Sequence, residues 1–137
     1  MDREKRVLEL LRQMIAINSE TATEKEQAME VYLLHVLSKI KENVWCGSLP
    51  VRNDSLGRSV VYGFIEGRRA DTLIFMNHHD VVGCEAYGKL APYAFSPEIL
   101  AEKLRHSEID LETETDLDSN EWLFGRGACD MKGGIAA

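Results

Sequence analysis

The chain has 137 residues, of which 45% are hydrophobic and 28% charged, and this is sufficient for one globular domain with an apolar core. Its formal net charge of -7 argues against nucleic acid and anionic membrane surfaces as partners, because both would repel an acidic protein. The sequence has no apolar run long enough to span a bilayer and no signal-peptide stretch at its N-terminus, so we expect a cytoplasmic location.

Two helices are predicted at the start of the chain. From Arg3 to Ile17 the apolar residues recur with a period close to 3.6, which gives one apolar stripe along a helix. Thr23 and Glu26 have the spacing of a capping box, in which each residue satisfies a free backbone N–H at the start of a helix. We therefore expect a second helix that reaches about Lys41.

Strands are predicted in the middle of the chain. Ser59 to Ile65 is rich in β-branched and aromatic residues. Thr72 to Met76 has no polar alternation, as in a strand that is covered on both faces inside a helix-flanked sheet. Ser96 and the proline after it predict the start of a short helix that ends near Arg105, and residues 121–124 predict a short strand. The order of elements predicts an α/β fold.

An acidic segment precedes the last predicted strand. Seven of the fourteen residues from Glu108 to Glu121 are acidic, which is typical of a solvated surface loop. The residues from Asp116 resemble the start of an EF-hand calcium loop. The sixth position holds Glu121 instead of glycine and the twelfth holds Gly127 instead of glutamate, so a calcium loop is rejected.

The first candidate for chemistry follows directly on the predicted buried strand. The neutral imidazole of His78 is a good zinc ligand, and Asp80 lies on the same side of an extended backbone, where it can hold the other ring nitrogen. His79 could take the place of His78, but the residue two positions after it is Val81, which cannot orient a ring. The alternative is a surface histidine beside an aspartate at the end of a strand, because the pattern is short and common.

The second candidate is the glycine-rich segment 125–134. Its glycines permit backbone conformations that other residues disfavour, and they bracket Asp130 and Lys132. Asp130 could bridge two cations, which would offset the cost of burying its charge. The alternative is a glycine turn that leads into a helix with Asp130 as a cap. A dinucleotide loop is rejected because Asp130 replaces the third glycine and would repel a pyrophosphate.

Together, segments 77–82 and 123–134 resemble the N-terminal part of the co-catalytic zinc amidohydrolases. That family includes acetylornithine deacetylase, succinyl-diaminopimelate desuccinylase, aminoacylase and glutamate carboxypeptidase. The resemblance implies a zinc-exopeptidase-like fold, a site with two zinc ions that cobalt or manganese could replace, and a cis peptide after Asp130. It also implies that His78 binds one zinc ion and that Asp130 bridges both ions. Asp80 is then a catalytic residue, whose role is to orient the ring of His78.

The resemblance implies hydrolysis of an amide bond in a small N-acyl amino acid or peptide. The long insert between Asp80 and Asp130 is most similar to the arginine-utilisation branch of the family, and so suggests amino-acid catabolism. Residues 1–137 correspond to the N-terminal part of the catalytic domain, without the lid or dimerisation domain. The glutamate pair that supplies the general base, the other carboxylate ligand and the last histidine have no counterpart here, and the loop position of Glu85 makes it a poor substitute.

We therefore expect this chain alone to be inactive. Two other functions stay open, namely a single-metal hydrolase completed by other groups, and a non-catalytic folded fragment that only binds or associates. We also expect weak metal binding, because two protein ligands leave a zinc ion mostly bound to water. A homo-oligomer is expected because the predicted sheet would have an open edge.

Overall fold

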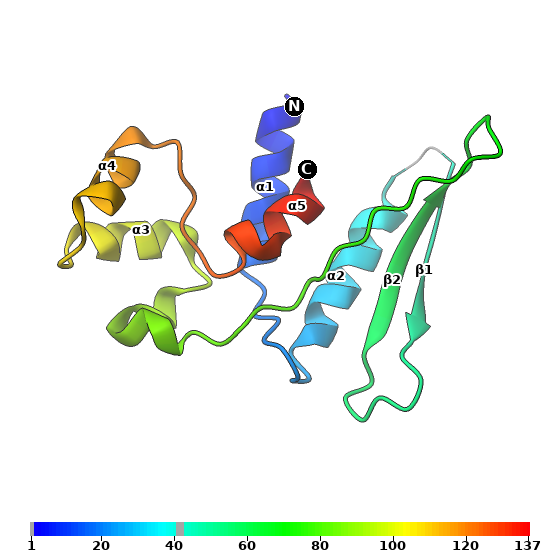
Figure 1. Ribbon diagram of the computed structural model, residues 1–137, viewed down its shortest axis with the longest axis horizontal. Helices are drawn as coiled ribbons and strands as arrows, with labels where there is room; N and C mark the ends of the chain where they lie inside the picture. The colour runs from blue at the N-terminus through cyan, green and yellow to red at the C-terminus, as the bar shows by residue number, and fades with distance from the viewer. Residues whose placement is uncertain (1, 41–42) are drawn as a thin grey trace.

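The computed structural model describes residues 2–40 and 43–137. Its helices and strands, in chain order, are α1 (Arg3–Ile15), α2 (Glu26–Ser38), β1 (Val44–Pro50), β2 (Ser59–Ile65), η1 (Glu85–Tyr93), α3 (Pro97–Arg105), α4 (Leu111–Ser119), η2 (Ala128–Lys132) and α5 (Gly133–Ala136). The β hairpin and α2 lie at one end of the molecule, α1 and α5 lie in the middle, and α3 and α4 lie at the other end (Figure 1).

The two predicted N-terminal helices are both present. α1 begins at the predicted residue and ends at Ile15, two residues early. α2 ends at Ser38, and the predicted end at Lys41 lies outside the described residues. The side chain of Glu26 accepts a hydrogen bond from the backbone N of Ala22 at 2.7 Å, whereas a capping box would place this bond at Thr23.

The strand β2 has the predicted bounds, and its partner is a strand that the sequence did not predict. β1 pairs antiparallel with β2 from Val44 opposite Ile65 to Pro50 opposite Ser59. Glycine and proline are both depleted in strands, so Gly47 and Pro50 weakened the strand pattern of β1.

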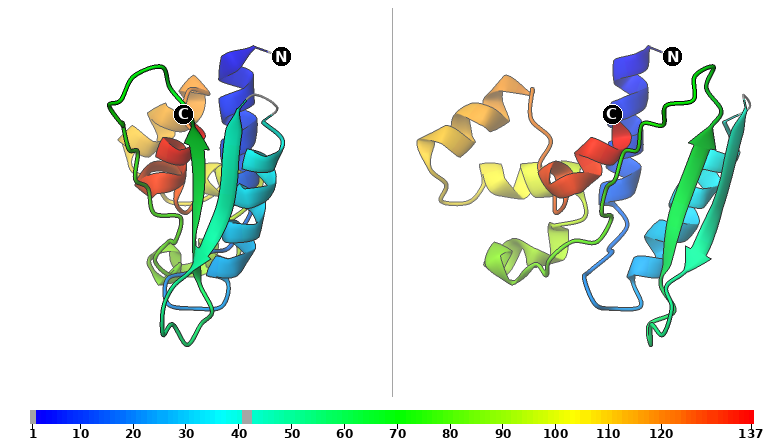
Figure 2. Two further views of the ribbon diagram at one scale, coloured as in Figure 1. Left: turned by 90° about the vertical axis from the view of Figure 1, so that its right-hand side faces the viewer. Right: turned by 45° about the vertical axis from the view of Figure 1, so that its right-hand side comes forward.

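The predicted buried strand from Thr72 to Met76 is wrong in this structure. The segment has no regular secondary structure, and Phe75 and Met76 are 83% and 86% exposed. Figures 1 and 2 show the chain after β2 crossing from the hairpin to the central helices without a strand beside it. A strand needs a neighbour for its backbone hydrogen bonds, and among the described residues β1 and β2 pair only with each other. The larger helix-flanked sheet stays a prediction.

Two further predictions are wrong in the C-terminal half. The acidic segment is not a loop throughout, because it contains α4. Asp110 caps this helix by accepting a hydrogen bond from the backbone N of Thr113 at 2.7 Å, and Asn120 ends it in the left-handed conformation. Residues 121–124 form no strand, since no strand pairs with them among the described residues. The predicted helix after Ser96 is confirmed as α3, with proline at its first position.

The core lies where α1, α2 and α5 meet. Met14, Met29 and Ala136 form its buried centre. The partly buried residues that pack around this centre are Val7, Leu10, Leu11, Ile17, Tyr32, Leu33 and Ile135. Within residues 2–40 and 43–137, no helix has both the length and the apolar character needed to cross a membrane.

Candidate metal centre

His78 lies between the two aspartates that the sequence singled out. Its ring Nδ1 is 3.2 Å from Oδ1 of Asp80, and its Nε2 is 2.9 Å from Oδ1 of Asp130. The expected contact between His78 and Asp80 is therefore present, and Asp130 reaches the same ring from 52 residues further along the chain. The three side chains do not converge at strand ends, because the strand predicted before His78 does not form. His78 and Asp80 lie on irregular backbone, and Asp130 lies in η2, where its backbone angles are not helical.

Residues 19–21 hold the segment that carries His78. Backbone hydrogen bonds of 2.9 Å join Thr21 N to Val81 O and Val81 N to Ser19 O, and they form an isolated parallel bridge. The buried hydroxyl of Ser19 donates to the carbonyl of His79 at 2.6 Å. These bonds replace the strand pairing that the sequence predicted, and they fix the backbone on both sides of Asp80.

Thr21 also contacts the proposed orienting carboxylate. Its Oγ1 donates to Oδ2 of Asp80 at 2.7 Å, while the other oxygen of Asp80 faces His78. Partial burial acts to raise the pKa of Asp80, but the hydrogen bond from Thr21 and the neighbouring His78 hold that pKa below its ordinary value. Asp80 is thus ionised and oriented at neutral pH, as a residue that holds a ring nitrogen must be.

The glycine-rich segment positions Asp130. Gly127 has φ +81°, and a Cβ atom there would lie 2.6 Å from Cγ1 of Val81, so glycine is required both by conformation and by space. The backbone N of His78 donates to the sulfur of Met131 at 3.4 Å, which joins the two segments directly. The peptide bond between Asp130 and Met131 is cis, as the family resemblance led us to expect.

Lys132 anchors this segment to the core. Its side chain is 0% exposed, and its Nζ donates to the carbonyls of Met14 at 2.9 Å and Ile17 at 2.7 Å. These carbonyls are at and just beyond the C-terminal end of α1, where a helix leaves acceptors unpaired and favours positive charge. Burial lowers the pKa of Lys132 from 10.5 to about 8. The lysine therefore ties α1 to the residues that carry Asp130.

The charges around His78 favour its protonated form when no cation is bound. The hydrogen bond with Asp130 is the main cause of a raised pKa for His78, and Asp80 adds to it although partial burial opposes it. The expectation that Asp130 is buried is wrong, because its side chain is 85% exposed. A carboxylate in this position has no large desolvation cost to offset.

The donor atoms decide whether these residues suit a zinc ion. An imidazole nitrogen and a carboxylate oxygen are both zinc ligands, and Nε2 of His78 and Oδ1 of Asp130 face each other. Asp80 on Nδ1 would leave Nε2 free to coordinate. Among the described residues, however, no group of three or more histidine, cysteine, aspartate or glutamate side chains could hold a metal ion. The residues present therefore fit two ligands of a zinc site and the carboxylate that orients one of them.

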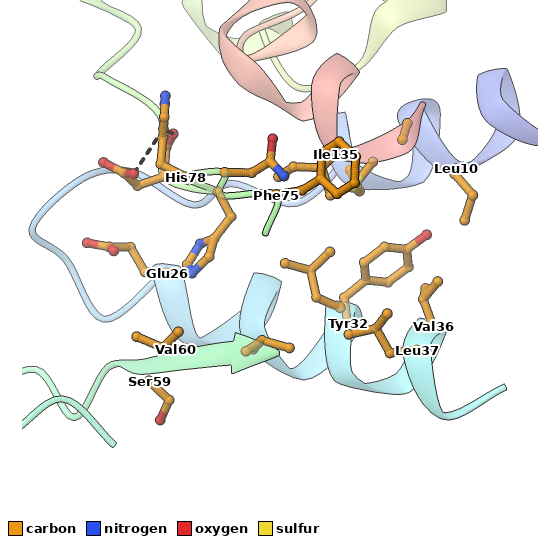
Figure 3. Close-up of a pocket in the computed structure, with 17 residues that line it drawn as sticks. Leu10, Glu26, Tyr32, Val36, Leu37, Ser59, Val60, Phe75, His78 and Ile135 are labelled. Carbon is orange, nitrogen blue, oxygen red and sulfur yellow. Dashed lines mark hydrogen bonds and ion pairs between the residues drawn. The ribbon is translucent and has the colours of Figure 1, made fainter. Parts of the chain in front are cut away.

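A cavity of about 380 Å³ lies beside this centre, between α2, β2 and the segment before Asp80. Figure 3 shows His78 at one end of it and the apolar side chains of Leu10, Val36 and Leu37 toward the other. His79 also lines the cavity, and its buried Nδ1 has no hydrogen-bond partner in the part of the chain that the structure describes. The hydrogen bonds and ion pairs of Asp80 and Asp130 with a histidine ring among the described residues are made by His78, and not by His79.

Sequence reasoning missed Thr21 as part of the centre. Its side chain contacts Asp80, which lies 59 positions further along the chain, and no local sequence pattern predicts a contact over that separation. The sequence also gave no role to Lys132 beyond its place beside Asp130 in the glycine-rich segment. A lysine in an apolar, glycine-rich setting is the signal that could have revealed an anchor, because a buried ammonium group needs acceptors.

The chain is similar to two bacterial proteins. It is 34% identical to Protein RocB of Bacillus subtilis (strain 168), over 99% of this chain and 25% of that protein. It is 32% identical to the uncharacterized protein YqjN of the same organism, over 94% of this chain and 24% of that protein. No protein-family model matches the chain, and no solved structure gives a significant match. The chain thus spans about a quarter of the length of the curated relatives that it matches.

Proposed function

We propose that residues 1–137 form the N-terminal part of the catalytic domain of a metal-dependent hydrolase that cleaves amide bonds in N-acyl amino acids or peptides. The observation that carries this proposal is the contact of one imidazole with two carboxylates, Asp80 on Nδ1 and Asp130 on Nε2. The two motifs that resemble zinc amidohydrolases supply these three residues, and the fold brings them together.

Each residue has one role in this proposal. His78 and Asp130 hold zinc, and Asp80 fixes the tautomer of His78 so that Nε2 carries the lone pair. When bound, zinc would polarise the amide carbonyl and lower the pKa of a water molecule. Thr21 keeps Asp80 in place through its hydroxyl, and Lys132 keeps the glycine-rich segment against α1.

The general base is expected from outside residues 1–137. Among the described residues, no glutamate forms a hydrogen bond with His78, Asp80 or Asp130. We therefore propose that this chain alone does not turn over substrate. The similarity to Protein RocB fits the arginine-utilisation branch that the motifs resemble, so amino-acid catabolism is the proposed setting.

A second candidate is a folded fragment that binds or associates without catalysis. It is favoured by the exposed apolar side chains of Leu73, Ile74, Phe75 and Met76, which form one continuous run. Such a run promotes pairing between copies of the chain, and a homo-oligomer stays our prediction. Sedimentation of the chain at high concentration distinguishes a stable monomer from an associating species.

The experiment that tests the hydrolase proposal uses a chimera. Residues 1–137 replace the matching quarter of Protein RocB, and the parent and the chimera are assayed with zinc or cobalt on N-acetyl amino acids and dipeptides. We expect chelator-sensitive hydrolysis by both, and a loss of at least about a hundredfold in the chimera with His78→Ala, as for the removal of an essential metal ligand. The matched control is His106→Ala, which changes a histidine next to the end of α3.

Two results would contradict the proposal. One is a folded parent and a folded chimera that hydrolyse none of the amides. The other is hydrolysis that persists unchanged with His78→Ala. Zinc-dependent turnover by the 137-residue chain alone would contradict the prediction that its general base lies elsewhere.

A further inference from the structure

A second cavity, of about 300 Å³, also borders the candidate metal centre. It is lined by His78, Asp80 and Asp130, and also by Tyr87 from η1 and Arg126 from the glycine-rich segment. Among the described residues that line this cavity, Arg126 alone carries a permanent positive charge. A cavity that joins two carboxylates, a histidine and an arginine is suited to a small polar ligand.

Arg126 is fixed in position by its neighbours, but among the described residues its guanidinium group has no carboxylate partner. The central carbon of its guanidinium group lies 4.7 Å from the centre of the Tyr87 ring, which is the geometry of a cation–π contact. Its backbone N donates to the carbonyl of Ala94 at 2.8 Å, so the residue is fixed next to the end of η1. Its Nε is buried and has no hydrogen-bond partner among the described residues. The side chain also forms no ion pair with any carboxylate that the structure describes.

An unpaired guanidinium group in this position has a defined preference. A buried donor without an acceptor costs free energy, and a ligand that supplies the acceptor recovers it. The planar fork of arginine matches the two oxygens of a carboxylate, and charged hydrogen bonds of this kind are stronger than neutral ones. Tyr87 limits the rotation of the group, so less entropy is lost when a ligand binds.

We propose that Arg126, stacked on Tyr87, binds the carboxylate group of the substrate beside the metal centre. This rests on the proposed function, in which the substrate is an N-acyl amino acid or peptide. Such a substrate carries its free carboxylate one carbon away from the nitrogen of the scissile amide. Arg126 would thereby select substrates with a free carboxylate and direct the amide toward His78 and Asp130, which line the same cavity.

The test compares two small ligands on the full 137-residue chain by NMR. N-acetylglycine carries the carboxylate, and N-acetylglycinamide is its neutral analogue of almost the same shape. We expect N-acetylglycine to shift the Nε–H signal of Arg126 and the amide signal of Gly127 in a saturable way, and to bind at least about tenfold more tightly than the amide.

Variants separate recognition from folding. Arg126→Gln should weaken binding of N-acetylglycine at least about tenfold and leave the weak binding of the amide unchanged. Arg126→Lys should retain part of the preference as a point charge, and Tyr87→Phe should retain it fully because the ring face remains. The control is Arg105→Gln, since Arg105 pairs with Asp118 away from this cavity. Backbone spectra of each variant establish that the fold is intact.

The outcomes also separate this inference from the proposed function. Equal binding of the two ligands, no binding of either, or unchanged binding in a folded Arg126→Gln variant overturns the carboxylate site, even if zinc shifts the ring signals of His78. Carboxylate binding that depends on Arg126 supports the site, and it does so even if zinc leaves His78 unaffected and the hydrolase proposal fails.

Discussion

His78 follows residues 72–76, and its partner Asp130 lies within residues 125–136. The two segments differ in how they are held in the structure. The first segment is apolar and exposed, and its residues reach the centre without regular structure. The second contains a buried lysine, a glycine with positive φ and a helix that packs in the core. The comparison shows that apolar character alone does not bury a segment, whereas specific backbone and side-chain partners do.

The largest expected effect concerns the anchor of the packed segment. Lys132→Met keeps the bulk of the side chain but removes both hydrogen bonds, one to the carbonyl of Met14 in α1 and one to that of Ile17 just beyond its end. We expect the free energy of unfolding to fall by about 3 kcal/mol. Each lost hydrogen bond to a charged group costs about 1.5–3 kcal/mol, and part of this loss is offset because methionine has no charge to bury. Urea unfolding measures it, with the exposed Lys5→Met as control. A change below about 0.5 kcal/mol would show that Lys132 is not an anchor.

A smaller effect is expected at the turn before Asp130. Gly127→Ala places a Cβ atom in the left-handed conformation and 2.6 Å from Val81. The expected loss is about 2 kcal/mol, from backbone strain and the displaced contact together. Gly67→Ala is the matched control, because a Cβ atom there would meet nothing within 4 Å. Equal unfolding midpoints for the two variants would contradict the packed description of this segment.

The next effect concerns the bond that orients the centre. Thr21→Val removes the hydroxyl that donates to Asp80, so the free energy of unfolding should fall by about 1 kcal/mol at pH 7. The pKa of Asp80 should rise, since this hydrogen bond lowers it. A lowered pKa stabilises the fold above the ordinary value near 3.8, and this stability is lost as the pH falls through the folded-state pKa. The variant should therefore lose less stability on acidification than the parent chain.

An NMR titration of the Asp80 carboxyl carbon measures the pKa shift directly. Thr115→Val is the control, because Thr115 donates to a carbonyl of its own helix. An unchanged pKa for Asp80 in the Thr21 variant would contradict the assigned contact.

The smallest effect is expected in the exposed segment. Ile74 is 72% exposed, so Ile74→Thr should change the free energy of unfolding by less than about 0.5 kcal/mol. The same variant should reduce association if the apolar run pairs copies of the chain, which sedimentation measures. A loss above about 1.5 kcal/mol without any change in association would mean that the segment is buried within the monomer, as the sequence pattern predicted.

The sequence predicted those elements whose signals are local. The periodicity of residues 3–17, the proline after Ser96 and the β-branched run of β2 each act within a few positions, and α1, α3 and β2 are present. The strand at residues 72–76 failed because a strand depends on a partner elsewhere in the chain. The helix α4 was not predicted, because so high an acidic content is typical of a solvated loop, although Asp110 caps the helix.

The site divides in the same way. The spacing of His78 and Asp80 gave their contact, because a two-residue step along an extended backbone keeps side chains on one side. The prediction that Asp130 lies near the same ring rested on the family resemblance, and not on the spacing of the residues. Thr21, Tyr87 and the carbonyls that accept from Lys132 were not predicted, since each contact joins distant positions.

The most direct test of the metal centre is an NMR titration of the histidine ring nitrogens with zinc. We predict that zinc shifts Nε2 of His78 while the rings of His35 and His106 stay unaffected, with a dissociation constant weaker than about 1 μM because two protein ligands are present. Asp130→Asn should weaken this binding at least about tenfold. Ring signals of His78 that do not change at saturating zinc, or that change equally in the Asp130 variant, would contradict the assignment of His78 and Asp130 as metal ligands.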